Sequence, residues 1–252
     1  MKAIFLATTA IMLVAAGMAG AADLGVAYKP APARPACAQF GGFYVGANIG
    51  AGYYTAHRND DDGYFNDNAG HTTSGSGWNG GVQGGYNWQR GCTVLGVEVD
   101  WSWSSAKAQF QDGPNQVPAI TLTIDSKLRS FGTARTRTGI IVDDVLLYVT
   151  GGLAWANVDN TYAFIFQSII NEQHSFSSTR WGFTAGFGTE WALGGNWTLK
   201  SEALYMQFKQ QQDQFFSPFA GRNVRFTNND NVWVARVGVN YVFGSGAVRA
   251  AY

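Results

Sequence analysis

The sequence is short of charge, cysteine, proline and long apolar runs. Asp, Glu, Lys and Arg make up 13% of the 252 residues, against ~25% in an average soluble domain. The formal net charge is zero, which argues against bulk binding of nucleic acid. After the first 22 residues no run of 18 apolar residues occurs, so a membrane-spanning helix is excluded there. If the exported chain crosses a membrane, it must do so as a closed β-barrel.

Sequence motifs of common enzymes and metal sites are also missing. Neither a Gly-x-Ser-x-Gly elbow nor a His-Glu-x-x-His motif is present. The three histidines, His57, His71 and His174, fall in expected loops. An acidic run, Asp60–Asp62, lies near His57, but no further ligand spacing supports a metal site. We therefore expect solvated loop residues, no metal, no cofactor and no enzymatic activity.

Apolar and polar residues alternate along most of the chain, most clearly over 78–104. One parity carries Trp78, Val82, Tyr86 and Trp88, while the other carries polar residues and glycine. After a turn at 90–92, the alternation resumes from Leu95 to Trp103. A period of two indicates β-strands with one apolar face. Aromatic residues near the strand ends are typical of the interfacial girdles of a membrane barrel.

The same pattern predicts eight strands, at 40–56, 78–88, 94–104, 125–142, 145–157, 180–191, 197–206 and 233–243. The strand at 145–157 is apolar on both parities, so its faces stay unassigned. Short turns at 90–92, 142–145 and 193–196 alternate with long loops expected near 57–76, 107–124, 160–175 and 210–229. This asymmetry predicts an all-β fold: an eight-stranded antiparallel up-and-down transmembrane β-barrel with long external loops and short periplasmic turns.

The residues outside the barrel predict export to the outer membrane of a Gram-negative cell. Residues 1–22 have the basic start, apolar core and small-residue end of a cleaved signal peptide. An Ala/Pro-rich periplasmic linker is expected at 23–39. The barrel then covers 40–243, and a C-terminal extension covers 244–252.

Four segments together resemble the porin-family outer-membrane proteins of alphaproteobacteria, which have an OmpA-like eight-stranded domain. These are residues 43–48 (FYVGAN), 95–101 (LGVEVDW), 132–139 (GTARTRTG) and 239–243 (VNYVF). The resemblance covers roughly residues 40–243 and implies an abundant, antigenic surface protein surrounded by outer-membrane lipids and lipopolysaccharide. Some relatives are assigned haem binding or adhesion, so no single molecular function follows from it.

The chain ending also resembles the strand signal read by the barrel-assembly machinery. Gly238, Tyr241 and Phe243 are the residues that match. The chain departs from the signal because it continues for nine residues, 244–252. On the strength of the three matching residues, we still expect the barrel-assembly machinery as a partner during biogenesis.

Charged residues collect on the inward parity of the predicted strands. Opposite charges inside a narrow barrel are expected to pair, because a lone buried ion costs several kcal/mol. An eight-stranded barrel is just wide enough for its own side chains, which favours a filled lumen over an ion path. The expected network consists of Glu98, Asp100, Arg129, Arg135, Arg137, Arg180, Glu190, Lys200, Glu202 and Arg236.

Three functional hypotheses arise from these features. The first is a structural surface barrel with a plugged lumen, and the second is a diffusion porin for small solutes. The third, a soluble lipocalin-like barrel, is disfavoured, because the outward parity carries Trp, Val, Ile and Phe. A further alternative is a receptor or adhesin that binds an unknown external ligand, such as haem, through its loops.

Apolar residues in two expected loops support that last alternative. They are Phe164, Ile165, Phe166, Ile169 and Ile170 in one loop, and Phe215, Phe216 and Phe219, with Arg222 and Arg225, in the other. The competing interpretation is that the strands extend past the membrane and pair there.

The two cysteines are expected to form a disulfide. Export takes both to an oxidising compartment. Cys37 lies before the first strand, and Cys92 lies in the turn that ends the antiparallel second strand. Their Cα atoms could approach within the ~7 Å limit. Closing this loop would contribute about 4 kcal/mol in the chain-entropy model; the alternative is two independent thiols.

Overall fold

The computed structural model describes residues 37–62, 70–112, 120–166, 170–217 and 221–243. All of them belong to one compact unit, Pro35–Tyr252. The signal peptide, the linker up to Ala36 and the C-terminal extension lie outside the described residues, so their predictions stay predictions. Within the described ranges, no helix is long and apolar enough to cross a membrane.

The chain is folded into strands joined in sequence order. Their bounds are β1 Gly42–Asp60, β2 Gly70–Arg90, β3 Thr93–Ser104, β4 Lys107–Asp112, β5 Ile120–Val142, β6 Val145–Phe166, β7 Ile170–Gly194, β8 Trp197–Phe208, β9 Gln211–Ser217 and β10 Arg222–Phe243. Each described turn at the periplasmic end is tight, as at Gly91, Asp143 and Gly194, which adopt positive φ angles.

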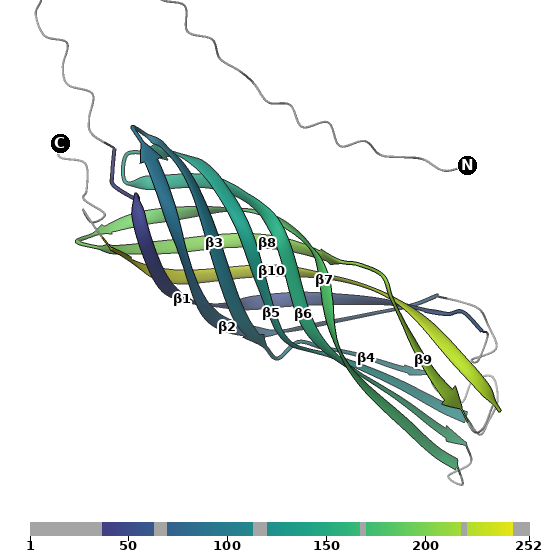
Figure 1. Ribbon diagram of the computed structural model, residues 1–252. Coiled ribbons are helices and arrows are strands. Elements are labelled where there is room, and N and C mark those ends of the chain that lie inside the picture. The colour runs from purple at the N-terminus through teal and green to yellow at the C-terminus, as the bar shows by residue number, and fades with distance from the viewer. Residues whose placement is uncertain (1–36, 63–69, 113–119, 167–169, 218–220, 244–252) are drawn as a thin grey trace, which may run out of the picture. The chain divides into compact units, whose positions relative to one another are not determined.

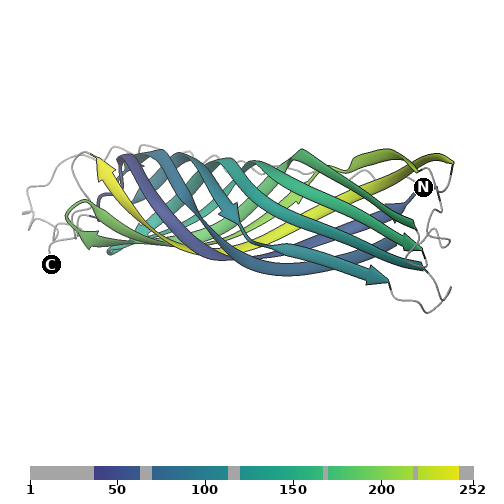
Figure 2. The same cartoon turned by 90° about the horizontal axis from the view of Figure 1, so that it is seen from below.

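Eight of these strands close into an antiparallel ring (Figure 1). The order is β1–β2–β3–β5–β6–β7–β8–β10, and β10 pairs with β1 from Phe43↔Phe243 to Asp60↔Phe226. Strand β4 resumes after β3 and pairs with β5, while β9 resumes after β8 and pairs with β10. The view in Figure 2 shows the strands tilted around the barrel. The prediction of an eight-stranded antiparallel barrel is confirmed.

Side chains alternate between the outside and the inside of the ring, as the sequence predicted. Along β3 exposed and buried residues alternate almost without a break. On the outside, Phe43, Ile49, Val99 and Phe187 are exposed. The faces of β6 are now assigned: even-numbered residues such as Leu146 and Val158 point inward. The sequence alone did not assign these two faces because parts of the lumen are apolar, so both faces of β6 carry apolar residues.

The strands run much further at the external end than the sequence predicted. The expected loops at 57–76, 107–124, 160–175 and 210–229 are mostly strand, because β1 reaches Asp60 and β6 reaches Phe166. Beyond the lipid, a strand no longer needs an apolar outer face, so its alternation of apolar and polar residues weakens although its backbone still pairs. The alternative that the strands extend and pair is the one observed.

Above the ring, these extensions form two sheets. Residues 70–77 of β2 form ladder pairs with β1, and residues 170–180 of β7 form them with β6. By these ladders, one external sheet is β7–β6–β5–β4 and the other is β9–β10–β1–β2, and β4 lies beside β2 without a ladder between them. Their inner faces continue the lumen of the barrel.

Candidate functional site in the barrel lumen

The centre of the lumen holds a layer of paired charges, with Arg135 in the middle. Its guanidinium contacts Glu98, lies 3.1 Å from Asp100 and lies 2.9 Å from Glu202. Arg236 shares two of these acids, at 3.1 Å from Asp100 and 2.7 Å from Glu202. Both arginines are thus surrounded by carboxylates from β3 and β8.

Two further cations complete the layer toward the periplasmic end. Lys200 lies 2.7 Å from Glu98, and Arg137 lies 2.9 Å from Glu190. The Arg137 guanidinium is also held between two rings, 4.6 Å from the centre of Tyr44 and 5.3 Å from that of Tyr148. Removal of any one cation would therefore leave at least one buried carboxylate with one fewer partner.

Strand register explains which pairs form. Glu98 lies directly opposite Arg135 in the β3–β5 ladder, and Glu202 lies opposite Arg236 in the β8–β10 ladder. Such neighbours share a face because parity places both inside. The contact of Arg135 with Glu202 is different, because it crosses the lumen between strands that do not pair.

The layer is neutral and fully enclosed. Four carboxylates face four cations, and their exposed fractions lie between 1% and 4%; they are Glu98, Asp100, Glu190 and Glu202 with Arg135, Arg137, Lys200 and Arg236. Hydroxyls supply more hydrogen bonds: Tyr44 donates to Glu98 at 2.7 Å and Tyr148 donates to Glu202 at 3.0 Å. A buried ion is tolerated when its charge and its hydrogen bonds are satisfied in this way.

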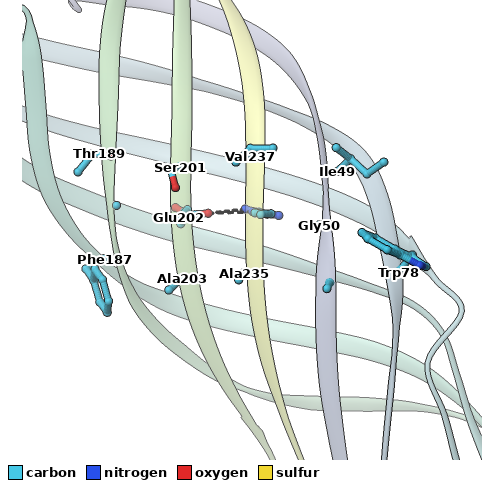
Figure 3. Close-up of a pocket in the computed structure, with 13 residues that line it drawn as sticks. Ile49, Gly50, Trp78, Phe187, Thr189, Ser201, Glu202, Ala203, Ala235 and Val237 are labelled. Carbon is cyan, nitrogen blue, oxygen red and sulfur yellow. Dashed lines mark hydrogen bonds and ion pairs between the residues drawn. The ribbon is translucent and has the colours of Figure 1, made fainter.

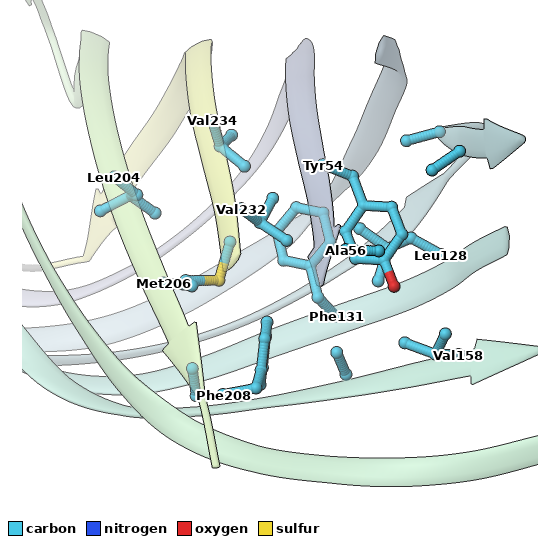
Figure 4. Close-up of a cluster of buried hydrophobic side chains, with 14 residues drawn as sticks. Tyr54, Ala56, Leu128, Phe131, Val158, Leu204, Met206, Phe208, Val232 and Val234 are labelled. Carbon is cyan, nitrogen blue, oxygen red and sulfur yellow. The ribbon is translucent and has the colours of Figure 1, made fainter. Parts of the chain in front are cut away.

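Apolar side chains close the lumen on both sides of the charges. Toward the periplasm, Phe40 packs with Val94, Ile141 and Leu146. Toward the exterior, a larger cluster includes Phe131, Leu204 and Met206, which Figure 4 shows pointing into the lumen. The lumen therefore alternates apolar and ionic layers along its axis, and side chains from all sides fill it.

Arg129 is a correction to the predicted network. The sequence put it inside with Arg135, but its side chain is exposed and lies 3.4 Å from Asp159. A β-bulge is the reason: Leu128 pairs with Val158 and Ser130 pairs with Asn157, so Arg129 is the extra residue. The bulge shifts the inside–outside alternation by one residue.

Arg180 is buried as expected but belongs to a second ionic layer, in the external extension. There it contacts Asp230, while Arg58 lies 2.6 Å from the other oxygen of Asp230. Asp213 accepts hydrogen bonds from Asn160 at 3.2 Å and from Asn228 at 2.7 Å. Sequence reasoning missed this layer because Arg58, Asn160 and Asp213 fell in expected loops, although Tyr54, Ala56 and Arg58 keep one parity.

The second layer links the two external sheets. Arg58 of β1 bonds to Ser126 of β5 at 2.9 Å, and Arg180 of β7 reaches Asp230 of β10. Since each contact joins one sheet to the other, the layer holds them together.

At the periplasmic base, Cys37 and Cys92 are joined by a disulfide with Cα atoms 5.5 Å apart. Neighbouring backbone groups bind Gln89, whose side chain accepts from the Phe40 amide at 2.7 Å and donates to the Ala38 carbonyl at 3.0 Å. The end of the predicted linker, Cys37–Gln39, is therefore packed against the barrel, with Ala38 fully buried.

The residues of the assembly-type signal lie on the last strand. Tyr241 stacks edge-on against Phe243 with ring centres 5.2 Å apart, and Phe243 is the last residue of β10. Gly238 lies between them and the centre of the membrane band, opposite Asn48 of β1. Both aromatic side chains belong to the periplasmic girdle.

Most other predicted loop residues lie on the external strands. His57 hydrogen-bonds Thr72 at 2.7 Å, and the ring of His174 stacks on Phe215 at 4.5 Å. Of the residues described, no three His, Cys, Asp or Glu side chains form a potential metal site. The side chains of His71, Phe164, Ile165, Phe166 and Ile170, and all of Ile169 and Phe219, lie outside the described residues.

The outer surface of the ring is apolar and has a groove of about 490 Å³ (Figure 3). Its floor is a row of cross-strand neighbours, Ala51, Ala235 and Ala203. Trp78 and Phe187 continue this row on either side. This groove thus opens toward lipid rather than into the lumen.

Comparison with known proteins agrees with this geometry. The family model described as "Outer membrane protein beta-barrel domain" matches residues 8–245. The chain belongs to this family. It is 34% identical to the 31 kDa outer-membrane immunogenic protein of Brucella melitensis, over 96% of this chain and 100% of that protein. It is 30% identical to a 22 kDa outer membrane protein of Rhizobium leguminosarum, over 73% of this chain and 71% of that protein.

Among solved structures, the outer membrane protein OprG of Pseudomonas aeruginosa aligns with a TM-score of 0.46 and 11% identity, covering 80% of this chain and 97% of that chain. The expected resemblance to alphaproteobacterial outer-membrane proteins is confirmed by the relatives from Brucella and Rhizobium. The protein is therefore an outer-membrane β-barrel in contact with membrane lipids.

Proposed function

We propose that this outer-membrane β-barrel protein is a structural surface protein whose lumen does not conduct. The observation that carries the proposal is the central layer of four carboxylates and four cations, each at most 4% exposed. An ion that crossed this layer would have to break several charge-assisted hydrogen bonds in a low-dielectric interior. Apolar clusters above and below add two further barriers.

Planar-bilayer recordings test this proposal. Folded wild-type protein should add no steady conductance to the bilayer. An Arg135→Ala variant should add conductance, because it leaves Glu98, Asp100 and Glu202 with one fewer partner and removes a large side chain. An Arg225→Ala variant is the matched control, since Arg225 lies in the external extension and is exposed. Steady unit conductance of the wild type would contradict the proposal and favour a diffusion porin.

A second candidate function is favoured by a group of stacked rings in the external extension. Tyr162 stacks on Phe226 at 5.0 Å, and Phe215 stacks on both Phe226 at 5.9 Å and His174 at 4.5 Å. Phe216 beside them is 56% exposed. A receptor for a flat apolar ligand such as haem would use such rings. Titration of folded protein with haemin tests this, and equal affinity of wild type and Phe215→Ala would refute it.

The proposal also covers partners and chemistry. The protein has no enzymatic role, since its buried charged groups pair with one another and other side chains occupy the space around them. Lipopolysaccharide surrounds its external half, and the barrel-assembly machinery reads Tyr241 and Phe243 during insertion. Slower insertion of a Phe243→Ala variant by reconstituted machinery would support the second point, and unchanged insertion would refute it.

A further inference from the structure

Three cations lie together on the outer surface of β4 and β5. Lys107, Lys127 and Arg129 are all exposed, and Lys107 lies directly opposite Lys127 in the β4–β5 ladder. Like charges placed directly opposite each other destabilise a sheet. The bulge that turns Arg129 outward adds a third positive charge to the same surface. Three cations on one surface therefore do not stabilise the pairing of β4 with β5, and their grouping needs another explanation.

Nearby acids balance the patch only in part. Asp159 lies opposite Lys127 and 3.4 Å from Arg129. Asp125 is one row further from the membrane, opposite Gln109 and Thr161. Within the described part of the chain, neither lysine forms an ion pair with a carboxylate, so three cations face two acids and the surface keeps a positive excess.

The tryptophans beneath the patch mark the edge of the lipid. Trp101, Trp155 and Trp181 occupy one cross-strand row, with ring centres 6.3 Å and 6.0 Å apart in turn. Trp103, 62% exposed, lies one step further out, opposite Ser130. Rows of this kind form the aromatic girdle at the membrane–water boundary.

The distance from this girdle to the lysines matches the depth of a lipid headgroup. Lys127 is three residues beyond Ser130 along β5. That is about 10 Å of strand, or roughly 7 Å of height for a strand tilted by ~45°. The headgroup region on each side of a bilayer is about 5–7 Å thick. The two ammonium groups therefore lie at the level of the lipid phosphates, on the outer surface of the barrel rather than in its lumen.

We infer that Lys107, Lys127 and Arg129 form a binding site for the phosphorylated headgroup of an anionic lipid of the outer leaflet. The cations neutralise the phosphate, and the phosphate in turn relieves the repulsion between the lysines. Trp101 and Trp103 contact the first part of the acyl chains. The inference depends on the proposed external orientation of the long strand ends, and it is independent of whether the lumen conducts.

Binding of lipid A carrying two phosphates to the folded protein in detergent tests this site. Native mass spectrometry gives the ratio of bound to free protein across a titration. The double variant Lys107→Gln/Lys127→Gln should bind about 25-fold more weakly, roughly 5-fold for each lysine near an anionic surface. The control Lys209→Gln removes a lone exposed external cation and should change the affinity less than about 2-fold.

Two comparisons identify the chemistry recognised. Dephosphorylated lipid A should bind wild type at least as weakly as the phosphorylated form binds the double variant, which keeps Arg129. Inorganic phosphate at equal phosphate concentration should not compete, because it lacks the acyl chains. Heat-modifiable gel mobility shows that each variant is folded, independently of conductance. Equal affinity of wild type and double variant, or displacement by inorganic phosphate, would overturn the inference.

Discussion

At the scale of single residues, Gly132 shows how the aromatic girdle restricts the backbone beneath it. Gly132 lies between Trp101 and Trp155 in one cross-strand row. A Cβ atom there would lie 2.7 Å from the Asp100 carbonyl oxygen and still closer to the Trp155 ring. Glycine is needed because the Trp155 ring covers its position.

Gly132→Ala should therefore destabilise the barrel by about 1–3 kcal/mol, the usual cost of overpacking. Gly80→Ala is the matched control, because a Cβ atom at Gly80 meets only the Asn48 carbonyl oxygen at 3.7 Å. Urea unfolding in lipid vesicles measures both. A Gly132→Ala variant as stable as the Gly80→Ala variant would show that the ring can move aside freely.

Asp62 offers a pH-dependent contact at the external end. Its carboxylate accepts hydrogen bonds from Arg225, at 2.8 Å from Nη2 and 2.9 Å from the backbone amide. The hydrogen bond from the Arg225 side chain is the main cause that lowers the pKa of Asp62. A lowered folded-state pKa means that the contact stabilises the fold above the ordinary value of ~3.9 and is lost as the pH falls through the folded-state pKa.

A carbon-13 NMR titration of the Asp62 carboxyl should therefore give a midpoint below ~3.9 in the wild type. In an Arg225→Gln variant the midpoint should move up toward that value. Identical midpoints in the two proteins would show that the contact does not persist in solution.

At the scale of elements, the sequence predicted the ring better than its external extension. Within the membrane band one face must be apolar, so strands 40–56 and 233–243 could be read from alternation alone. Outside it, residues such as Arg58, Asp213 and Asp230 point inward from strands whose outer faces are also polar. Alternation fails there because water replaces lipid on the outside, while the polar inner layer remains. The sequence pattern does not reveal the bulge at Arg129, since with one inserted residue the alternation is compatible with Arg129 on either face of the strand.

Asp230 joins the two external sheets through its contact with Arg180. Its two oxygens contact Arg58 of β1 and Arg180 of β7. Asp230→Asn should leave two buried guanidinium groups undercompensated and lower the local opening free energy by about 3 kcal/mol. Hydrogen exchange should accelerate in residues 170–181 and 211–217 but not in the periplasmic half of the ring.

Asp143→Asn is the matched control for that experiment. Asp143 is exposed in a periplasmic turn with φ of 55°, a conformation that asparagine tolerates. The hydrogen-exchange pattern of the Asp143→Asn variant should equal that of the wild type. Uniform acceleration along the whole barrel in Asp230→Asn would show instead that the ring and its extension open as one unit.

At the scale of the whole molecule, the distribution of polarity is reversed relative to a soluble domain. Charged pairs fill the centre, while large apolar side chains such as Phe187, 63% exposed, cover the outside. This reversal follows from the solvent: lipid surrounds the ring, and a narrow lumen must satisfy its own charges. The charges of the central layer could be assigned from parity, but their contacts across the lumen depend on closure of the ring, which no local pattern encodes.

The outward position of Phe187 leads to a test of the orientation of the entire barrel. It lies on β7 between the girdle residues Trp181 and Trp191, close to the middle of the apolar band. Phe187→Arg should therefore weaken folding into lipid by about 2–4 kcal/mol, the cost of arginine near the bilayer midplane. Gln173→Arg is the control on the same strand, exposed in the external extension, and should cost almost nothing. Equal folding stability of the two variants in vesicles would mean that β7 does not cross the membrane in this orientation.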